Sequence, residues 1–149
     1  MDNNVSMTAL MSAFAIAYQN EFKNPVLRDG YVRRLISDEE YGGIKSYIKS
    51  GADALFPGKS FSSDEERISF AVNTQFAPTP AARAAYCDES IRAAIRTGTK
   101  QYVILGAGLD IFAFRNSDLM KKIRVFEVDH PKTQEDKLIR LKNAGLDIS

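Results

Sequence analysis

Two short apolar runs near the carboxyl end of the sequence constrain the fold more than any other feature. The run QYVIL, residues 101–105, lacks polar alternation and is followed directly by Gly106. A strand that is covered on both faces has this pattern. The run IRVFEVD, residues 123–129, is rich in β-branched and aromatic residues and predicts a second strand.

Helical patterns accompany the two predicted strands. The stretch FRNSDLMKK between them can hold a short helix, and PKTQEDKLIRLKNAG follows the second strand. Pro131 suits the start of that last helix and Gly145 its end, and its charged residues predict a solvent-exposed face. Strand, glycine turn, helix, strand and helix is the order of a βαβ unit. The sequence therefore predicts a parallel α/β sheet.

The residues before the first strand are predicted to be helical throughout. One face of the opening amphipathic helix carries Leu10, Phe14, Ala17 and Tyr18. A second helix is predicted to begin near Pro25 in NPVLRDGYVRRLIS, and a third to end at Gly51 in DEEYGGIKSYIKSG. Ser62 or Ser63 can cap the helix that follows.

The clearest helical pattern is TPAARAAYCDESIRAAIRTG. Thr79 can cap this helix, Pro80 suits its first turn and Gly98 suits its end. Its apolar stripe consists of Cys87, Ile91, Ala94 and Ile95. We therefore divide the chain, within one domain, into a helical amino-terminal region at 1–98 and a first βαβα portion of the sheet at 99–149.

Composition and charge exclude several classes of protein. The 149 residues suit one domain with a substantial core. The 20 basic and 19 acidic residues give a net charge of +1, which provides no bulk attraction to nucleic acid or to a membrane surface. A single cysteine, Cys87, excludes an internal disulfide, and one histidine beside it leaves too few ligands for a His/Cys zinc cluster. The apolar run near the amino terminus lacks the positive residues of a leader peptide and is too short to span a membrane. We expect a cytoplasmic protein without a metal, nucleic-acid or membrane partner.

Glycine and acidic residues at the ends of the predicted strands indicate a ligand site. Ligands of doubly wound sheets bind beyond the carboxyl ends of the strands. Gly106 and Gly108 let the backbone turn sharply and let a ligand approach it closely. Asp129 ends the neighbouring strand, where a carboxylate can accept hydrogen bonds from both hydroxyls of a ribose. Together these residues predict a site for a nucleoside-containing cofactor.

The same residues favour S-adenosylmethionine over a dinucleotide. The dinucleotide fingerprint requires a third glycine at position 111, where this chain has Ile111. Asp110 also lies where a phosphate would approach. A nucleoside cofactor without phosphates therefore suits the site better than NAD, and S-adenosylmethionine is such a cofactor.

Structural roles for these residues are the alternative. The two glycines can serve close packing between helix and strand. Asp129 can cap the helix that starts at Pro131, and Asp110 can bind backbone amides of the helix that follows it. Glu127 is a second acidic candidate on the same face of the strand, one step deeper than Asp129. Cys87 is interpreted as a core residue because it lies on an apolar stripe.

Several segments together resemble one protein family. ILGAGLDIFAFR followed by VFEVDHP is similar to the signature of the leucine carboxyl methyltransferase family. SMTALMSAFAIAYQ, NPVLRDGYVRRLI and RAAYCDESI resemble the helical amino-terminal region of its bacterial branch, which includes polyketide O-methyltransferases of the tetracenomycin type. The resemblance covers nearly the whole chain. It implies a class I methyltransferase (Rossmann-like) fold that binds S-adenosylmethionine and methylates a carboxylate or hydroxyl oxygen of a small molecule.

The resemblance also implies roles for individual residues. The cofactor-binding residues that it implies are Arg83, Gly106, Gly108, Asp110 and Asp129. Arg83, three residues before Tyr86, matches the arginine that pairs with the methionine carboxylate of the cofactor. Two positions depart from the family pattern: Ile111 replaces a hydroxyl residue, and one arginine precedes Tyr86 where bacterial members often have two.

The sheet is expected to be incomplete in this chain, because only two strands of the family's seven are visible. No residue stands out as a general base, so the catalytic residues stay unknown. Two other function classes remain open: a nicotinamide-dependent oxidoreductase, and a non-catalytic truncated or interaction module with a vestigial site. Strands with open apolar edges also predict self-association.

Overall fold

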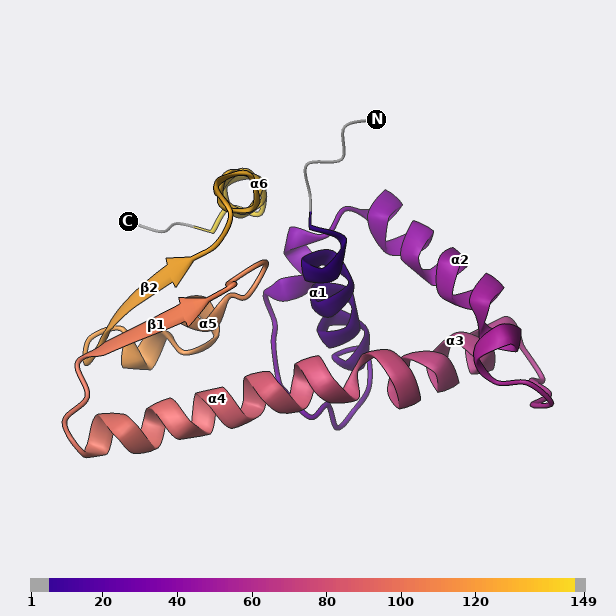
Figure 1. Cartoon of the computed structure of the whole chain (residues 1–149), viewed down its shortest axis with the longest axis horizontal. Coiled ribbons are helices and arrows are strands. Elements are labelled where there is room, and N and C mark those ends of the chain that lie inside the picture. The colour runs from indigo at the N-terminus through magenta and orange to yellow at the C-terminus, as the bar shows by residue number, and fades with distance from the viewer. Residues whose placement is uncertain (1–5, 147–149) are drawn as a thin grey trace.

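The computed structural model describes residues 6–146, so the outermost residues of both predicted portions, 1–5 and 147–149, lie outside it. Helices precede a small sheet, as Figure 1 shows. The elements are α1 (Met7–Gln19), the 3-10 helix η1 (Val32–Leu35), α2 (Asp38–Leu55), α3 (Asp64–Ala71), the π-helical η2 (Val72–Phe76), α4 (Pro78–Arg96), β1 (Gln101–Leu105), α5 (Phe112–Arg115), the 3-10 helix η3 (Ser117–Leu119), β2 (Arg124–Val128) and α6 (Pro131–Asn143).

Strands β1 and β2 form a two-stranded parallel sheet, which confirms the predicted βαβ order. Their register runs from Gln101 opposite Arg124 to Leu105 opposite Val128. The predicted bounds of β1 are confirmed, while β2 is one residue shorter at each end than the 123–129 predicted. The described chain is thus a helix-rich α/β structure with a small parallel sheet.

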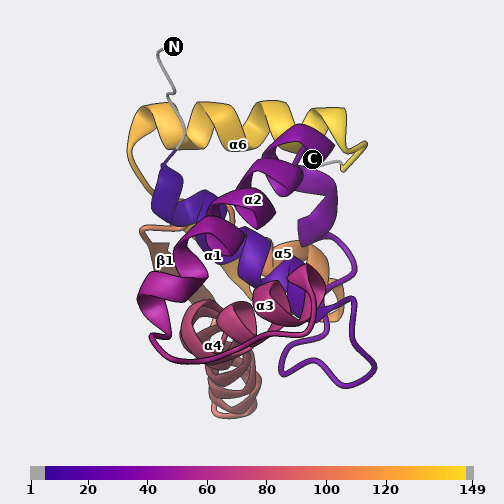
Figure 2. The ribbon, with the colours of Figure 1, turned by 90° about the vertical axis from the view of Figure 1, so that its right-hand side faces the viewer.

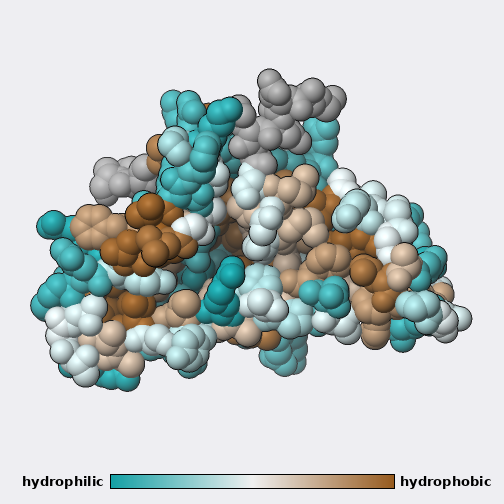
Figure 3. Space-filling model, viewed as in Figure 1, coloured by the Kyte–Doolittle hydropathy of each residue, from teal (hydrophilic) through white to brown (hydrophobic). Residues whose placement is uncertain are grey.

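The prediction that both faces of the strands are covered is wrong for the described chain. One face packs, through Tyr102, Ile104 and Val125, on a small core from α4, α5 and η3. The other face presents four exposed apolar side chains, and Figure 3 shows an apolar surface over these strands. They are Val103, Leu105, Phe126 and Val128. The strands are apolar on both sides, but the described helices pack on only one.

Helix α1 lies at the centre of the main core. Its predicted apolar face is confirmed, because all four residues are buried: Leu10, Phe14, Ala17 and Tyr18. Figure 1 shows α1 between the sheet on one side and α2 on the other, and Figure 2 shows α6 above it and α4 below. The Phe14 ring lies 4.8 Å from that of Tyr41 on α2, which joins the two helices through aromatic packing. The residues that form the opening helix therefore also hold the other helices around it.

The second predicted helix, starting near Pro25, is wrong. Turns occupy that stretch, and only the single 3-10 turn η1 follows. Side chains, and not helical hydrogen bonds, pair with the backbone groups of this stretch. The Asn20 side-chain amide donates to the Leu27 carbonyl (2.9 Å), and its oxygen accepts from the Asp29 backbone amide (2.8 Å). The Asp29 carboxylate in turn accepts from the amides of Tyr31 and Val32. Asparagine and aspartate favour such turns because their short side chains compete for backbone groups.

Other predicted helix ends are partly right. Ser63 caps α3 through the Glu66 amide (3.1 Å), which confirms one of the two candidates. Thr79 is not a cap, because η2 leads directly into α4, which begins at Pro78. Gly51 does not end α2, which continues to Leu55. A glycine inside a helix costs only about 1 kcal/mol relative to alanine, which the buried face of α2 can offset.

The charged residues of α6 are not simply a solvent-exposed face. Lys137 is 2% exposed, and its Nζ donates to the Glu127 carboxylate and to the Asp110 carbonyl. Arg140 donates to the Glu40 carboxylate on α2 at 2.6 and 2.8 Å. The prediction therefore fails for Lys137 and Arg140, which attach α6 to the rest of the molecule.

No helix among residues 6–146 combines the length and apolar character that crossing a membrane requires. In the same range, His, Cys, Asp and Glu side chains form no group of three or more that could hold a metal ion.

Candidate functional site

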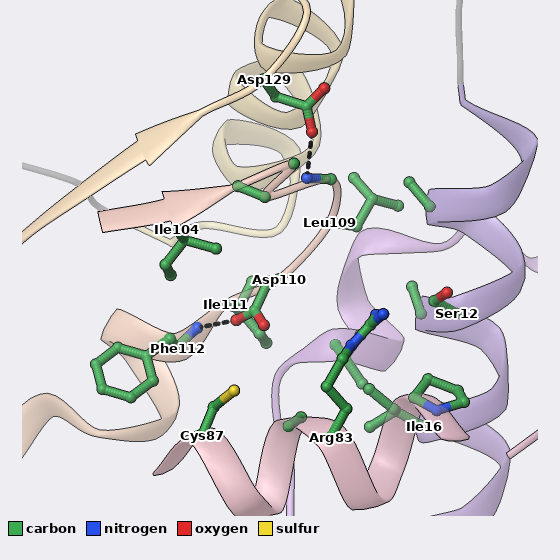
Figure 4. A pocket seen from close by; sticks show the side chains of 18 of the residues that line it. Ser12, Ile16, Arg83, Cys87, Ile104, Leu109, Asp110, Ile111, Phe112 and Asp129 are labelled. Carbon is green, nitrogen blue, oxygen red and sulfur yellow. Dashed lines mark hydrogen bonds between the residues drawn. The ribbon is translucent and has the colours of Figure 1, made fainter. Parts of the chain in front are cut away.

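A cavity of about 560 Å³ lies between α1, α4 and the segment that follows β1. Figure 4 shows side chains from all three elements around it, among them Ser12 of α1, Arg83 of α4 and Asp110 after the glycine turn. Its volume is in the range of small-molecule sites. The five residues predicted to bind a cofactor, Arg83, Gly106, Gly108, Asp110 and Asp129, all line it.

The glycine turn begins where β1 ends. Gly106 has φ +69° and Gly108 has φ +53°, a backbone region that side chains disfavour. The amides of Gly106 and Ala107 both donate to the Val128 carbonyl, at 2.8 and 3.3 Å, so the turn stays attached to β2. A Cβ on Gly108 would lie 3.0 Å from the Cβ of Ala9 on α1. The packing interpretation therefore holds for Gly108, although both glycines also border the cavity.

Asp129 bridges the ends of the two strands. One carboxylate oxygen accepts from the Gly108 amide at 2.6 Å, and the other accepts from the His130 amide at 2.6 Å. Each oxygen can accept a further hydrogen bond. The alternative role as helix cap is wrong, because His130 caps α6 by accepting from the Lys132 amide. Glu127, the second acidic candidate, binds Lys137 and is not among the residues that line the cavity.

Asp110 has the structural role that the sequence allowed. Its carboxylate accepts from the Phe112 amide at 2.6 Å, which fixes the start of α5 (Figure 4). Since it also borders the cavity, the structural contact does not remove it from the site.

Arg83 presents a charged guanidinium at the cavity wall. It lies on α4, is exposed, and points into the space between α1 and the glycine turn (Figure 4). Within residues 6–146, no hydrogen bond or ion pair to its side chain is found. An unpaired cation at a cavity wall is available for an anionic group of a ligand.

Cys87 is half-buried and borders the cavity next to Tyr102. Burial is the largest cause that raises the pKa of Tyr102, to about 12, and the nearby Cys87 side chain is the second. This phenol therefore stays neutral. Cys87 thus forms part of the cavity wall and lies beside Tyr102 of β1.

A buried ionic cluster at the cavity was not predicted from the sequence. The Arg115 guanidinium binds both oxygens of Asp88 (2.8 and 3.0 Å) and one oxygen of Asp29 (2.9 Å). Although burial opposes the charge, the hydrogen bond to Asp88 and the charges of Asp110, Asp88 and Asp29 raise the pKa of Arg115. All four side chains line the cavity. No local pattern connects them, since Asp29 and Arg115 are 86 positions apart, although all four lie in segments that resemble the family.

Comparison with known proteins identifies the family of the chain. The family model described as leucine carboxyl methyltransferase matches residues 9–149. The chain belongs to this family. The family predicted from the sequence motifs is therefore confirmed.

Curated relatives carry matching names. "Putative S-adenosyl-L-methionine-dependent methyltransferase YktD" of Bacillus subtilis (strain 168) is 41% identical over 153 residues, covering 98% of this chain and 49% of the relative. A protein of Mycolicibacterium gilvum (strain PYR-GCK) with the same general description is 31% identical and covers 96% of this chain and 45% of the relative. One from Mycobacterium marinum (strain ATCC BAA-535 / M) is 29% identical, with 95% and 43% covered. The chain thus spans about half the length of the curated relatives it matches.

Proposed function

We propose that this chain carries the cofactor-binding portion of an S-adenosylmethionine-dependent O-methyltransferase with a class I, Rossmann-like fold. The observation that supports this most is the arrangement around one cavity of the Gly106–Gly108 turn, the Asp129 carboxylate and the Arg83 guanidinium, which has no partner among residues 6–146. Family membership and the names of the relatives support the same proposal.

The residues fit S-adenosylmethionine better than a dinucleotide. Asp129 keeps acceptor capacity for ribose hydroxyls, and Arg83 offers a partner for the methionine carboxylate. The turn does not lead directly into a long helix, since α5 has 4 residues and starts after Ile111. A pyrophosphate would therefore lack the helix amino terminus that dinucleotide sites use.

The chain's contribution to catalysis is mainly to hold the cofactor in place. When bound, S-adenosylmethionine would supply an activated methyl group to an acceptor oxygen: the carbon–sulfur bond would break, with S-adenosylhomocysteine as the leaving group, as the carbon–oxygen bond forms. Asp129 and the glycine turn would fix the nucleoside, and Arg83 would fix the amino-acid end. Holding both ends orients the methyl group for in-line transfer, which is worth several kcal/mol in well-oriented reactions. We propose a small molecule with a carboxylate or hydroxyl oxygen as the acceptor.

Calorimetric titration with S-adenosylhomocysteine and with NADH tests the proposal. We expect S-adenosylhomocysteine to bind and NADH to bind more weakly. Tighter binding of NADH would contradict the proposal and favour a nicotinamide-dependent oxidoreductase. Absence of binding by either ligand would favour a non-catalytic module with a vestigial site.

A further inference from the structure

Arg115 joins three segments that form the walls of the cavity. It ends α5, which follows the glycine turn, and it contacts Asp88 of α4 and Asp29 of the loop before η1. Its guanidinium also lies 3.7 Å from the Asp110 carboxylate. The segments meet at this one side chain although they are distant in sequence.

The charged side chains of this cluster are buried. The Arg115 side chain is 7% exposed, that of Asp29 1% and that of Asp88 12%. Charges this deeply buried require good geometry, because an unpaired partner carries a large desolvation cost. Asp88 is held further by the Asn116 amide at 2.9 Å, and Asp29 by two backbone amides. The two bonds to Asp88 fix the orientation of α4 as well as its distance.

The same helix carries Arg83. A bond between Arg115 and Asp88 therefore sets where Arg83 lies relative to the glycine turn, although Arg115 itself does not contact Arg83. A ligand that reaches from the turn to Arg83 depends on this separation. A ligand that contacts only the turn and Asp129 does not.

We infer that Arg115 is a positioning residue for the cofactor: through Asp88 it holds the Arg83 guanidinium at the distance from the glycine turn that S-adenosylmethionine requires. This inference rests on the proposed function. It assigns to Arg115 an effect on the amino-acid end of the cofactor and none on the nucleoside end.

The test measures the affinity of the intact protein for two ligands. S-adenosylhomocysteine contains the amino-acid end, and 5′-methylthioadenosine lacks it. Arg115→Lys keeps the charge but loses the paired bonds, so it should weaken S-adenosylhomocysteine about tenfold and 5′-methylthioadenosine less than about twofold. Arg83→Ala should show the same pattern. The double variant should bind S-adenosylhomocysteine no more weakly than Arg83→Ala alone, because both changes remove one interaction.

Arg67→Lys is the matched control. Arg67 of α3 donates to both carboxylate oxygens of Asp53 of α2 at 2.7 Å, and neither residue lines the cavity, so this variant should change neither affinity. If Arg115→Lys does not fold, as judged by circular dichroism, Asp88→Asn replaces it and should give the same selective loss. Equal losses for both ligands, additive effects with Arg83→Ala, or an Arg83→Ala variant with unchanged affinity would each overturn the inference. Failure of the unchanged protein to bind either ligand would instead contradict the proposed function.

Discussion

At the scale of single residues, the Asp129 carboxylate has two roles. Its carboxylate holds the glycine turn through the Gly108 amide and borders the cavity from the end of β2. Glu127, two positions earlier, has a different partner, the buried Lys137 of α6. The residue after β2 thus presents a carboxylate to the cavity, and a residue within β2 presents one to the packing between strand and helix.

Replacing these two carboxylates should separate binding from stability. Asp129→Ala is expected to weaken S-adenosylhomocysteine by about 1.5–3 kcal/mol, the scale of hydrogen bonds to a charged group. Glu127→Ala should affect binding less and should lower the free energy of unfolding by ~3 kcal/mol, because Lys137 would remain buried without its carboxylate. Calorimetry and urea unfolding of both variants provide the comparison. If the two variants exchange these behaviours, Glu127 is the ligand-binding acid and the assignment along β2 is wrong.

The residues that follow the two predicted strands could be predicted as a site, and the buried ionic cluster could not. Gly106, Gly108 and Asp129 follow apolar runs whose parallel pairing brings their ends together, so a local pattern was sufficient. Asp29 carries no such pattern. It lies in a loop that the sequence suggested was helical, and its partner Arg115 is 86 positions away. The burial that gives this pair its importance arises only when the helices pack.

At the scale of secondary-structure elements, α6 depends on charged residues for its attachment. Arg140 donates two hydrogen bonds to Glu40 of α2 and one to the Leu35 carbonyl of η1. Pro131 at its start and Gly145 at its end predicted α6 itself but not this attachment. A lysine or arginine in an amphipathic pattern indicates a solvent-exposed position by default, and only the packed structure shows which of them find buried partners.

The Glu40–Arg140 pair should make stability depend on acid pH. Hydrogen bonding to Arg140 lowers the pKa of Glu40 from 4.5 to about 2. A lowered folded-state pKa means that the stabilisation is complete above pH 4.5 and is lost as the pH falls through about 2. Urea unfolding above pH 4.5 and at about pH 3 measures this loss. Glu40→Gln should lose less stability on acidification than the unchanged chain, and equal losses would contradict the role of the pair.

At the scale of the whole molecule, the sheet has an uncovered face. Its four apolar side chains are exposed by 50% (Val103), 78% (Leu105), 40% (Phe126) and 51% (Val128). Apolar surface of this kind is uncommon on a monomer unless it serves an interface. The curated relatives are about twice as long as this chain, and the two strands found among residues 6–146 leave both edges of the sheet open.

We expect the 149-residue chain to self-associate through this face and to be a poor methyltransferase alone. Sedimentation velocity at several concentrations, together with a methyl-transfer assay, measures both properties. A Val103→Thr, Phe126→Thr variant is the matched control, because these cross-strand partners keep strand propensity but lose apolar surface. The variant should sediment as a smaller species. A well-folded monomer of the unchanged chain, with turnover comparable to that of full-length relatives, would show that the open face has no such effect.

The location of S-adenosylhomocysteine in a crystal structure of the complex would show whether this cavity is the cofactor site. We predict the ligand in the cavity between α1, α4 and the glycine turn, with its ribose hydroxyls hydrogen-bonded to Asp129 and its carboxylate paired with Arg83. A ligand bound elsewhere, or a ribose bound to a different carboxylate, would contradict the account.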